Sequence, residues 1–168
     1  RRMVPGGLLV TCAEDEGACR LADAALAEGL RVVTYGRADR SLRDPDVVIS
    51  DVRVEAHGAG ASVTWGPRSA SLALSVPGEH NVLNATAAWV AGIECGLEPQ
   101  AIADGLGEFT GAARRFEARG QVGTRRLFDD YAHHPTEVEA AIREAHVVAG
   151  DGEVSVVFQP HLYSRTRI

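Results

Sequence analysis

The residues best suited to chemistry gather in one short segment, D-D-Y-A-H-H-P-T-E at positions 129–137. A strand-like apolar stretch precedes it and a helix-forming stretch follows, and open α/β sheets bind ligands where their strands end. The amino end of the following helix also favours anions. Asp130 and His133 are therefore candidate site residues. A metal site is not predicted, because neighbouring side chains of a strand point to opposite faces and the spacing matches no usual zinc pattern.

A second candidate site is the sequence H-N-x-x-N at positions 80–84. Asn81 and Asn84 are three residues apart, so both carboxamides lie on one face of the helix predicted over residues 81–95. A carboxamide combines a donor with an acceptor, which is the pairing that reads an adenine edge. The structural alternative is that Asn81 caps the helix while Asn84 is buried. The spacing leaves both interpretations open.

Arginine side chains mark two further candidates. In R-R-F-E at positions 114–117, adjacent guanidiniums that include Arg115 would clamp a phosphate between domains, unless the segment is a solvated linker. The sequence F-Q-P-H-L-Y-S-R-T-R at positions 158–167 follows another predicted strand and contains His161. There Arg165 would hold a carboxylate in a bidentate fork, with a frayed chain end as the alternative.

The first half of the chain alternates between strand and helix patterns. A helix over residues 15–28, closed by Gly29, separates apolar strands at 8–12 and 31–36, which predicts a β-α-β unit in a parallel sheet. Short β-prone pieces with turns at residues 58–60 and 66–67 then predict an antiparallel meander. These pieces are residues 47–49, 52–56, 62–65 and 71–76. Helices over residues 81–95 and 99–106 follow.

A domain boundary is predicted near Gly111. Beyond it, residues 125–131 read as a strand, and T-E-V-E at positions 136–139 is a capping box that opens a helix to residue 148. A further strand is predicted at residues 154–158. A doubly wound sheet needs more strands than these, so the second domain is expected to be truncated.

The composition narrows the class of protein. Hydrophobic residues make up 45% of the 168 residues, which is enough for a folded core. The formal net charge of -6 disfavours nucleic acid as a partner. Neither a membrane span of ~20 apolar residues nor a signal peptide is recognisable, so the cytoplasm is the expected location. The three cysteines show no C-x-x-C spacing and are expected to be buried thiols.

Taken in order, these motifs resemble those of the Mur ligases, the ATP-dependent amide ligases of peptidoglycan synthesis. The matching sequences are H-N-x-x-N, R-R-F-E and D-Y-A-H, the last at positions 130–133. The longer forms at residues 129–137 and 158–166 are similar to the branch that adds L-alanine to UDP-N-acetylmuramate. The resemblance implies an α/β fold in which residues 1–113 are the latter part of a P-loop-type central ATPase domain. Residues 114–168 would then begin a Rossmann-like C-terminal domain.

The resemblance also implies roles for individual residues, with ATP and Mg²⁺ as cofactors. The implied nucleotide-binding residues are Asn81, Asn84, Arg115 and Asp130. The implied catalytic residues are Asp130, His133 and Arg115. The implied residues on the side of the acyl phosphate and the amino acid are His133, His161 and Arg165.

The chain departs from the family in one chemical respect. It contains no Lys and no G-x-x-G-K-[ST] phosphate-binding loop, which in the family cradles the phosphates and places Mg²⁺. Residues 1–168 are therefore expected to be a fragment that does not catalyse ligation alone, with most Mg²⁺ ligands outside the chain. Two alternatives stay open. One is a sister ligase that recycles muropeptides or adds a later residue, and the other is a non-catalytic Mur-like domain that binds a nucleotide or a partner.

Overall fold

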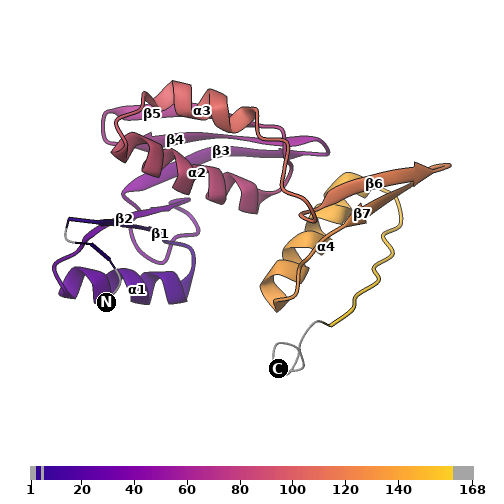
Figure 1. The fold of residues 1–168 in the computed structure, drawn as a ribbon, viewed down its shortest axis with the longest axis horizontal. Coiled ribbons are helices and arrows are strands. Elements are labelled where there is room, and N and C mark those ends of the chain that lie inside the picture. The colour runs from indigo at the N-terminus through magenta and orange to yellow at the C-terminus, as the bar shows by residue number, and fades with distance from the viewer. Residues whose placement is uncertain (1–2, 5, 161–168) are drawn as a thin grey trace.

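The computed structural model describes residues 3–4 and 6–160 as two units joined by a linker (Figure 1). The N-terminal unit contains β1 (Leu8–Cys12), α1 (Glu16–Ala27), β2 (Arg31–Gly36), β3 (Val47–Glu55), β4 (Gly58–Trp65), β5 (Arg68–Leu74), α2 (Glu79–Glu94) and α3 (Pro99–Gly107). The C-terminal unit contains β6 (Glu117–Val122), β7 (Arg125–Asp129) and α4 (Pro135–Ala149). Residues 108–116 form the linker.

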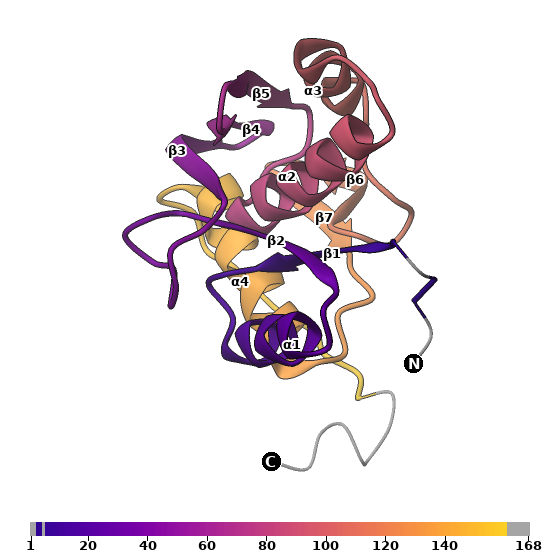
Figure 2. The same ribbon diagram turned by 90° about the vertical axis from the view of Figure 1, so that its left-hand side faces the viewer.

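One five-stranded sheet, in the order β1-β2-β3-β4-β5, organises the N-terminal unit. β1, β2 and β3 run parallel, whereas β3, β4 and β5 run antiparallel, so β3 belongs to both halves. The predicted β-α-β unit is confirmed. α1 and α2 lie on opposite faces of the sheet at its β1–β2 end (Figure 2).

The meander consists of three strands, and the prediction of four short pieces was wrong. β3 continues through Asp51, where the register shifts between Ser50 and Arg53 and Asp51 adopts a φ of 52°. A polar residue with left-handed backbone is typical of a turn, but a β-bulge accommodates it within a strand. The turn predicted at residues 58–60 is likewise part of β4.

The core lies between the sheet and one face of α2. The buried residues of α2 recur every three or four positions and are Val82, Ala85, Thr86, Trp89, Val90 and Ile93. This spacing is the helical period of a face that packs on a sheet. The Trp89 ring is fully buried, and its indole N–H donates to the carbonyl of Pro99 at 2.9 Å. The hydrogen bond also fixes α3 against α2, because Pro99 is the first residue of α3.

The C-terminal unit is an antiparallel β6–β7 hairpin with α4 beside it. The predicted strand at Arg125 is confirmed as β7. β6 was not predicted, because its sequence E-A-R-G-Q-V contains one β-branched residue and most of its side chains are exposed. The strand predicted over residues 154–158 was wrong, since none of the described residues after α4 forms a strand.

The start of α4 also differs from the prediction. His134 is the N-cap, its Nδ1 accepts from the Thr136 N–H at 3.4 Å, and the Glu137 carboxylate accepts from the His134 N–H at 3.3 Å. The capping box therefore begins two residues before Thr136. Pro135 explains the shift, because a proline without an N–H suits the first position of a helix.

The three cysteines differ in their exposure to solvent. Cys12 and Cys19 are half-buried whereas Cys95 is exposed, so the prediction of buried thiols was wrong for Cys95.

Among the described helices, none combines the length and the apolar character that crossing a membrane requires.

Candidate functional site

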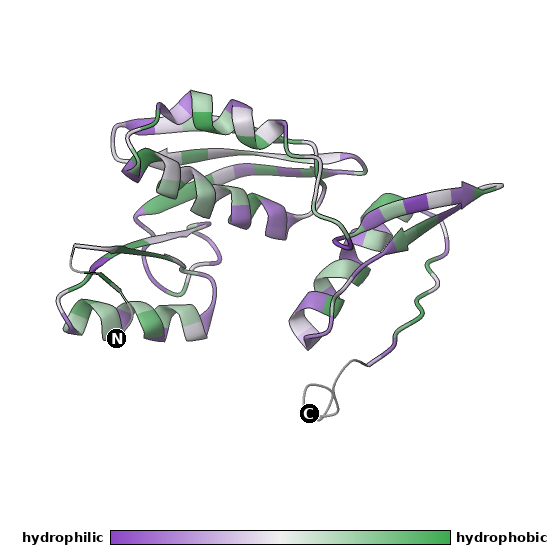
Figure 3. Cartoon of the chain, viewed as in Figure 1, coloured by the Kyte–Doolittle hydropathy of each residue, from purple (hydrophilic) through white to green (hydrophobic). Residues whose placement is uncertain are grey.

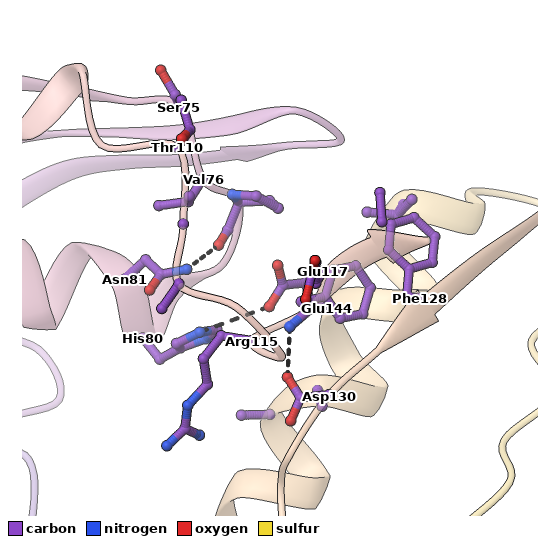
Figure 4. Close-up of a pocket in the computed structure, with 18 of the residues that line it drawn as sticks. Ser75, Val76, His80, Asn81, Thr110, Arg115, Glu117, Phe128, Asp130 and Glu144 are labelled. Atoms are coloured by element: carbon purple, nitrogen blue, oxygen red, sulfur yellow. Dashed lines mark hydrogen bonds and ion pairs between the residues drawn. The ribbon is translucent and has the colours of Figure 1, made fainter. Parts of the chain in front are cut away.

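A cleft of about 1150 Å³ lies between the two units. Its walls come from the N-terminal end of α2, the linker and one face of α4, which are far apart in the sequence (Figure 4). The end of α2 that faces the cleft is hydrophilic, in contrast to the middle of that helix (Figure 3). Four of the predicted site residues line the cleft: Asn81, Asn84, Arg115 and Asp130.

The two asparagines occupy the first turns of α2. Asn81 is not the N-cap, because that position is Gly78, and its Nδ2 donates to the carbonyl of Pro77 at 2.6 Å. Asn84 is exposed on the cleft side. The alternative of a capping Asn81 and a buried Asn84 was therefore wrong. A ligand in the cleft would meet the amide oxygen and the second N–H of Asn81, and the whole carboxamide of Asn84.

The linker approaches the C-terminal unit in an unusual backbone conformation. Arg114 and Phe116 have φ angles of 59° and 45°, a left-handed region that non-glycine residues seldom occupy. The Arg114 N–H donates to Glu117 Oε2 at 2.7 Å, and the Arg114 carbonyl accepts from the Tyr131 N–H at 2.8 Å. The Phe116 ring stacks on Phe128 with 4.5 Å between centroids. These contacts tie residues 114–116 to the C-terminal unit.

Asp130 completes this attachment. One carboxylate oxygen accepts from the Phe116 N–H at 2.7 Å (Figure 4). The other accepts from the Ala132 N–H at 2.6 Å. Hydrogen bonds from backbone N–H groups to a carboxylate are among the stronger ones in proteins. Asp130 therefore holds the linker against the end of β7 while its side chain also lines the cleft.

The Arg115 side chain points away from these contacts and lines the cleft (Figure 4). Its side chain is 53% exposed, and Nη1 lies 3.8 Å from Glu137 Oε1. An exposed pair at this distance contributes little stability. Most of the guanidinium therefore remains available to an anion, such as a phosphate, that enters the cleft.

His133 is the described candidate that the structure does not bring to the cleft lining. Its Nδ1 lies 3.0 Å from the Tyr131 carbonyl and 3.5 Å from Glu137 Oε2. Hydrogen bonds from the backbone N–H groups of His133 and His134 lower the pKa of Glu137, against a smaller opposing effect of burial. His161 and Arg165 lie outside the described residues.

The sequence did not predict the pair of His80 and Glu144, which lies in the wall of the cleft. His80 Nε2 on α2 is 3.7 Å from Glu144 Oε2 on α4 (Figure 4). The Glu144 side chain is 3% exposed and the His80 side chain is 43% exposed. The available signal was an acid at position 144 on the helical face of small apolar residues that includes Ala140, Ala141 and Val148.

A network of ion pairs anchors the end of α2 that carries the site. Arg37, which follows β2, donates from Nε and Nη2 to the two carboxylate oxygens of Glu14 at 3.0 and 2.6 Å. Nη1 of Arg37 and Nη1 of Arg40 lie 3.0 and 2.9 Å from Oε2 of Glu79, in the first turn of α2. Burial would raise the pKa of Glu14, but the hydrogen bonds from Arg37 outweigh burial and lower it. The β1 and β2 ends thereby fix the direction in which α2 begins.

Comparison with protein families explains why the walls of the cleft match known motifs. The model of the Mur ligase middle domain matches residues 1–92, and the model of the Mur ligase, glutamate ligase domain matches residues 114–167. The chain belongs to the Mur ligase family. In this Mur ligase chain, the cleft lies where the two matched segments face each other across the linker.

The names of individual relatives are consistent with this family assignment. The UDP-N-acetylmuramate--L-alanine ligase of Kineococcus radiotolerans is 53% identical over 167 residues, which cover 99% of this chain and 34% of that protein. The chain spans about a third of the length of the curated relatives it matches.

Two solved structures share the fold. MurF from Acinetobacter baumannii gives a TM-score of 0.74 at 25% identity, over 88% of this chain and 31% of that one. The UDP-N-acetylmuramate-alanine ligase MurC from Thermotoga maritima gives 0.67 at 31% identity, over 86% of this chain and 31% of that one. Both likenesses include most of this chain.

Proposed function

We propose that this chain is part of an ATP-dependent ligase that joins L-alanine to UDP-N-acetylmuramate in peptidoglycan synthesis. The observation that carries the proposal is the 53% identity to a ligase of that name over 99% of the chain. Because that identity extends over both walls of the cleft, it supports a shared site as well as a shared fold. We also propose that the middle and C-terminal domains meet at residues 113 and 114.

In the proposed reaction, ATP transfers its γ-phosphoryl group to the carboxylate of the muramate. The amine of L-alanine then attacks the acyl phosphate, and the products are the amide, ADP and phosphate. Phosphorylation replaces a poor leaving oxygen with a good one, so the protein contributes mainly positioning and charge stabilisation. Because the reaction consumes ATP, we propose the cytoplasm as its compartment.

We assign the nucleotide to the cleft. Asn81 and Asn84 present amide groups from one face of α2, where they would bind the adenine edge. Arg115 extends from the linker along the same cleft, where it would meet the phosphates. Asp130 acts by holding the linker, and therefore Arg115, through its two backbone hydrogen bonds.

We assign the nucleotide side of the site to the described residues and propose that most Mg²⁺ ligands lie outside this chain, which contains no phosphate-binding loop. Across residues 3–4 and 6–160, no three His, Cys, Asp or Glu side chains are arranged to hold a metal ion. His133, His161 and Arg165 stay proposed for the side of the acyl phosphate and L-alanine.

The test measures phosphate release by the complete enzyme that contains this chain, with ATP, Mg²⁺ and UDP-N-acetylmuramate present. L-alanine should start phosphate release, whereas a tripeptide or the amino acids added later should not. Dependence on a tripeptide would instead identify the muropeptide-recycling branch. Nucleotide binding without release, whatever the acceptor, would identify a non-catalytic Mur-like protein and refute the proposal.

Arg115→Ala tests the assignment of the phosphates. Removing a charge-assisted hydrogen bond costs about 1.5–3 kcal/mol, which is a loss of roughly 10- to 150-fold in affinity for ATP. Arg119→Ala is the matched control, because Arg119 is a partly exposed arginine of the same unit that pairs with Glu117 and Asp129. Equal effects of the two substitutions would contradict the role of Arg115.

A further inference from the structure

A polar contact between α2 and α4 links the two units directly, in addition to the linker. His80 Nε2 and Glu144 Oε2 are 3.7 Å apart, slightly beyond hydrogen-bond length, so a small rotation of one unit makes or breaks the bond. The carboxylate is almost completely buried. A buried acid needs a partner or a proton, because an isolated buried charge is costly.

Gly78 makes the close approach of α4 possible. A Cβ at this position would lie 2.7 Å from Cε1 of His80 and 3.2 Å from Oε2 of Glu144. The φ of 101° at Gly78 also disfavours any other residue there. The start of α2 therefore leaves a space that the Glu144 carboxyl group enters from the other unit.

Burial favours the neutral form of both groups of the pair. Burial, and then the negative charge of Asp130, raise the pKa of Glu144 to about 7. Burial lowers the pKa of His80, and Asp130 opposes this shift while Arg115 adds to it. Below about pH 7 Glu144 thus keeps its proton beside His80. Above about pH 7 Glu144 becomes a buried carboxylate near the negative charge of Asp130, which favours its exposure to water.

Other titratable groups also line the same cleft. Besides Asp130 and Arg115, these groups are His57 of the β3–β4 turn, Glu117 of β6, Arg126 of β7 and Glu137 of α4.

We infer that His80 and Glu144 form a latch between the units that sets the position of α4 against α2 and opens when the buried Glu144 carboxyl group ionises. Glu144 is thereby a positioning residue for Arg115. Residues 114–116 are bonded to the C-terminal unit, so the angle that the latch sets also sets the distance from Arg115 to Asn84. The latch itself needs no bound nucleotide, whereas the positioning of Arg115 for phosphates rests on the proposed function.

The test is an NMR titration of the chain from pH 6 to pH 8. Over this range the protonated fraction of a group with a pKa of about 7 falls from about 90% to about 10%. The side-chain carboxyl carbon of Glu144 should titrate near pH 7. Residual dipolar couplings should show α2 and α4 in one common alignment at pH 6 and in separate alignments at pH 8.

Glu144→Gln and Glu139→Gln are matched variants of α4. Glu144→Gln keeps the size of the side chain but cannot ionise, so α2 and α4 should keep one relative orientation at both pH values. Glu139 is exposed and pairs with Arg143 on the same helix, so Glu139→Gln should behave as the unchanged chain. The latch is refuted if Glu144 titrates near the ordinary pKa of glutamate. The partial positive charge at the N-terminal end of α2 would then stabilise the ionised carboxylate in place. A pH-dependent rotation that persists in Glu144→Gln would refute it as well.

Discussion

Replacing Asp130 with Asn should destabilise the C-terminal unit by about 2 kcal/mol. The two carboxylate oxygens accept from the N–H groups of Phe116 and Ala132 at 2.7 and 2.6 Å. Asn keeps one acceptor oxygen and turns an NH₂ group toward the second N–H, so one hydrogen bond to a charged group is lost. Such a bond contributes about 1.5–3 kcal/mol.

The loss has a second component in the linker backbone. Phe116 has a φ of 45°, and left-handed backbone costs an L-residue roughly 1–2 kcal/mol. The bond to Asp130 helps to hold that conformation, so weakening it lets Phe116 relax and lose its stacking on Phe128. Asp130→Ala, which removes both bonds, should therefore destabilise the unit by more than Asp130→Asn.

Urea unfolding followed by the amide signals of β6, β7 and α4 measures the stability of this unit. Asp129→Asn is the control, because Asp129 contacts only partly exposed arginine side chains in the described structure and should lose less than about 1 kcal/mol. Equal losses for Asp129→Asn and Asp130→Asn would show that the two backbone hydrogen bonds do not hold the linker.

Three further substitutions test other parts of the fold. Arg37→Met leaves the half-buried Glu14 carboxylate without its bidentate partner and should cost about 1.5–3 kcal/mol in chemical unfolding. A loss below about 1 kcal/mol would contradict the anchoring of α2. Asp51→Gly relieves left-handed backbone at an exposed bulge and should stabilise the protein by about 0.5–1 kcal/mol, measured as a higher Tm. A lower Tm would contradict the presence of backbone strain at Asp51. Gly58→Ala places a Cβ 2.5 Å from the carbonyl oxygen of Leu74 and should cost about 1–3 kcal/mol; an unchanged midpoint in urea would show that β4 and β5 separate easily.

Elements with strong periodicity could be predicted from the sequence. The face of α2 repeats with the helical period, and the β-α-β unit has two apolar strands on either side of a helix, so local pattern and tertiary packing agree. β6 could not be predicted, because pairing with β7 determines its conformation and its own residues show little preference for a strand. The strand predicted at residues 154–158 failed for the converse reason. Its residues are β-prone, yet among the described segments none pairs with it.

Some residues of the candidate site could likewise be predicted from the sequence, and others could not. Asn81, Asn84, Arg115 and Asp130 lie in sequence motifs, and all four line one cleft. Glu144 belongs to no motif and follows Glu137 and Glu139 in a helix where acids are common. Its burial depends on the approach of α2 from the other unit, and a sequence pattern does not report that approach.

The attachment of the linker to the C-terminal unit determines where the molecule can bend. Residues 114–116 are fastened by Asp130 and Tyr131, which places the pivot earlier, near Gly111 with its φ of 106°. Arg115 therefore has no flexible tether of its own. Arg115 moves only together with the C-terminal unit. Binding of an anion to its guanidinium would therefore favour one orientation of the whole unit relative to the N-terminal unit.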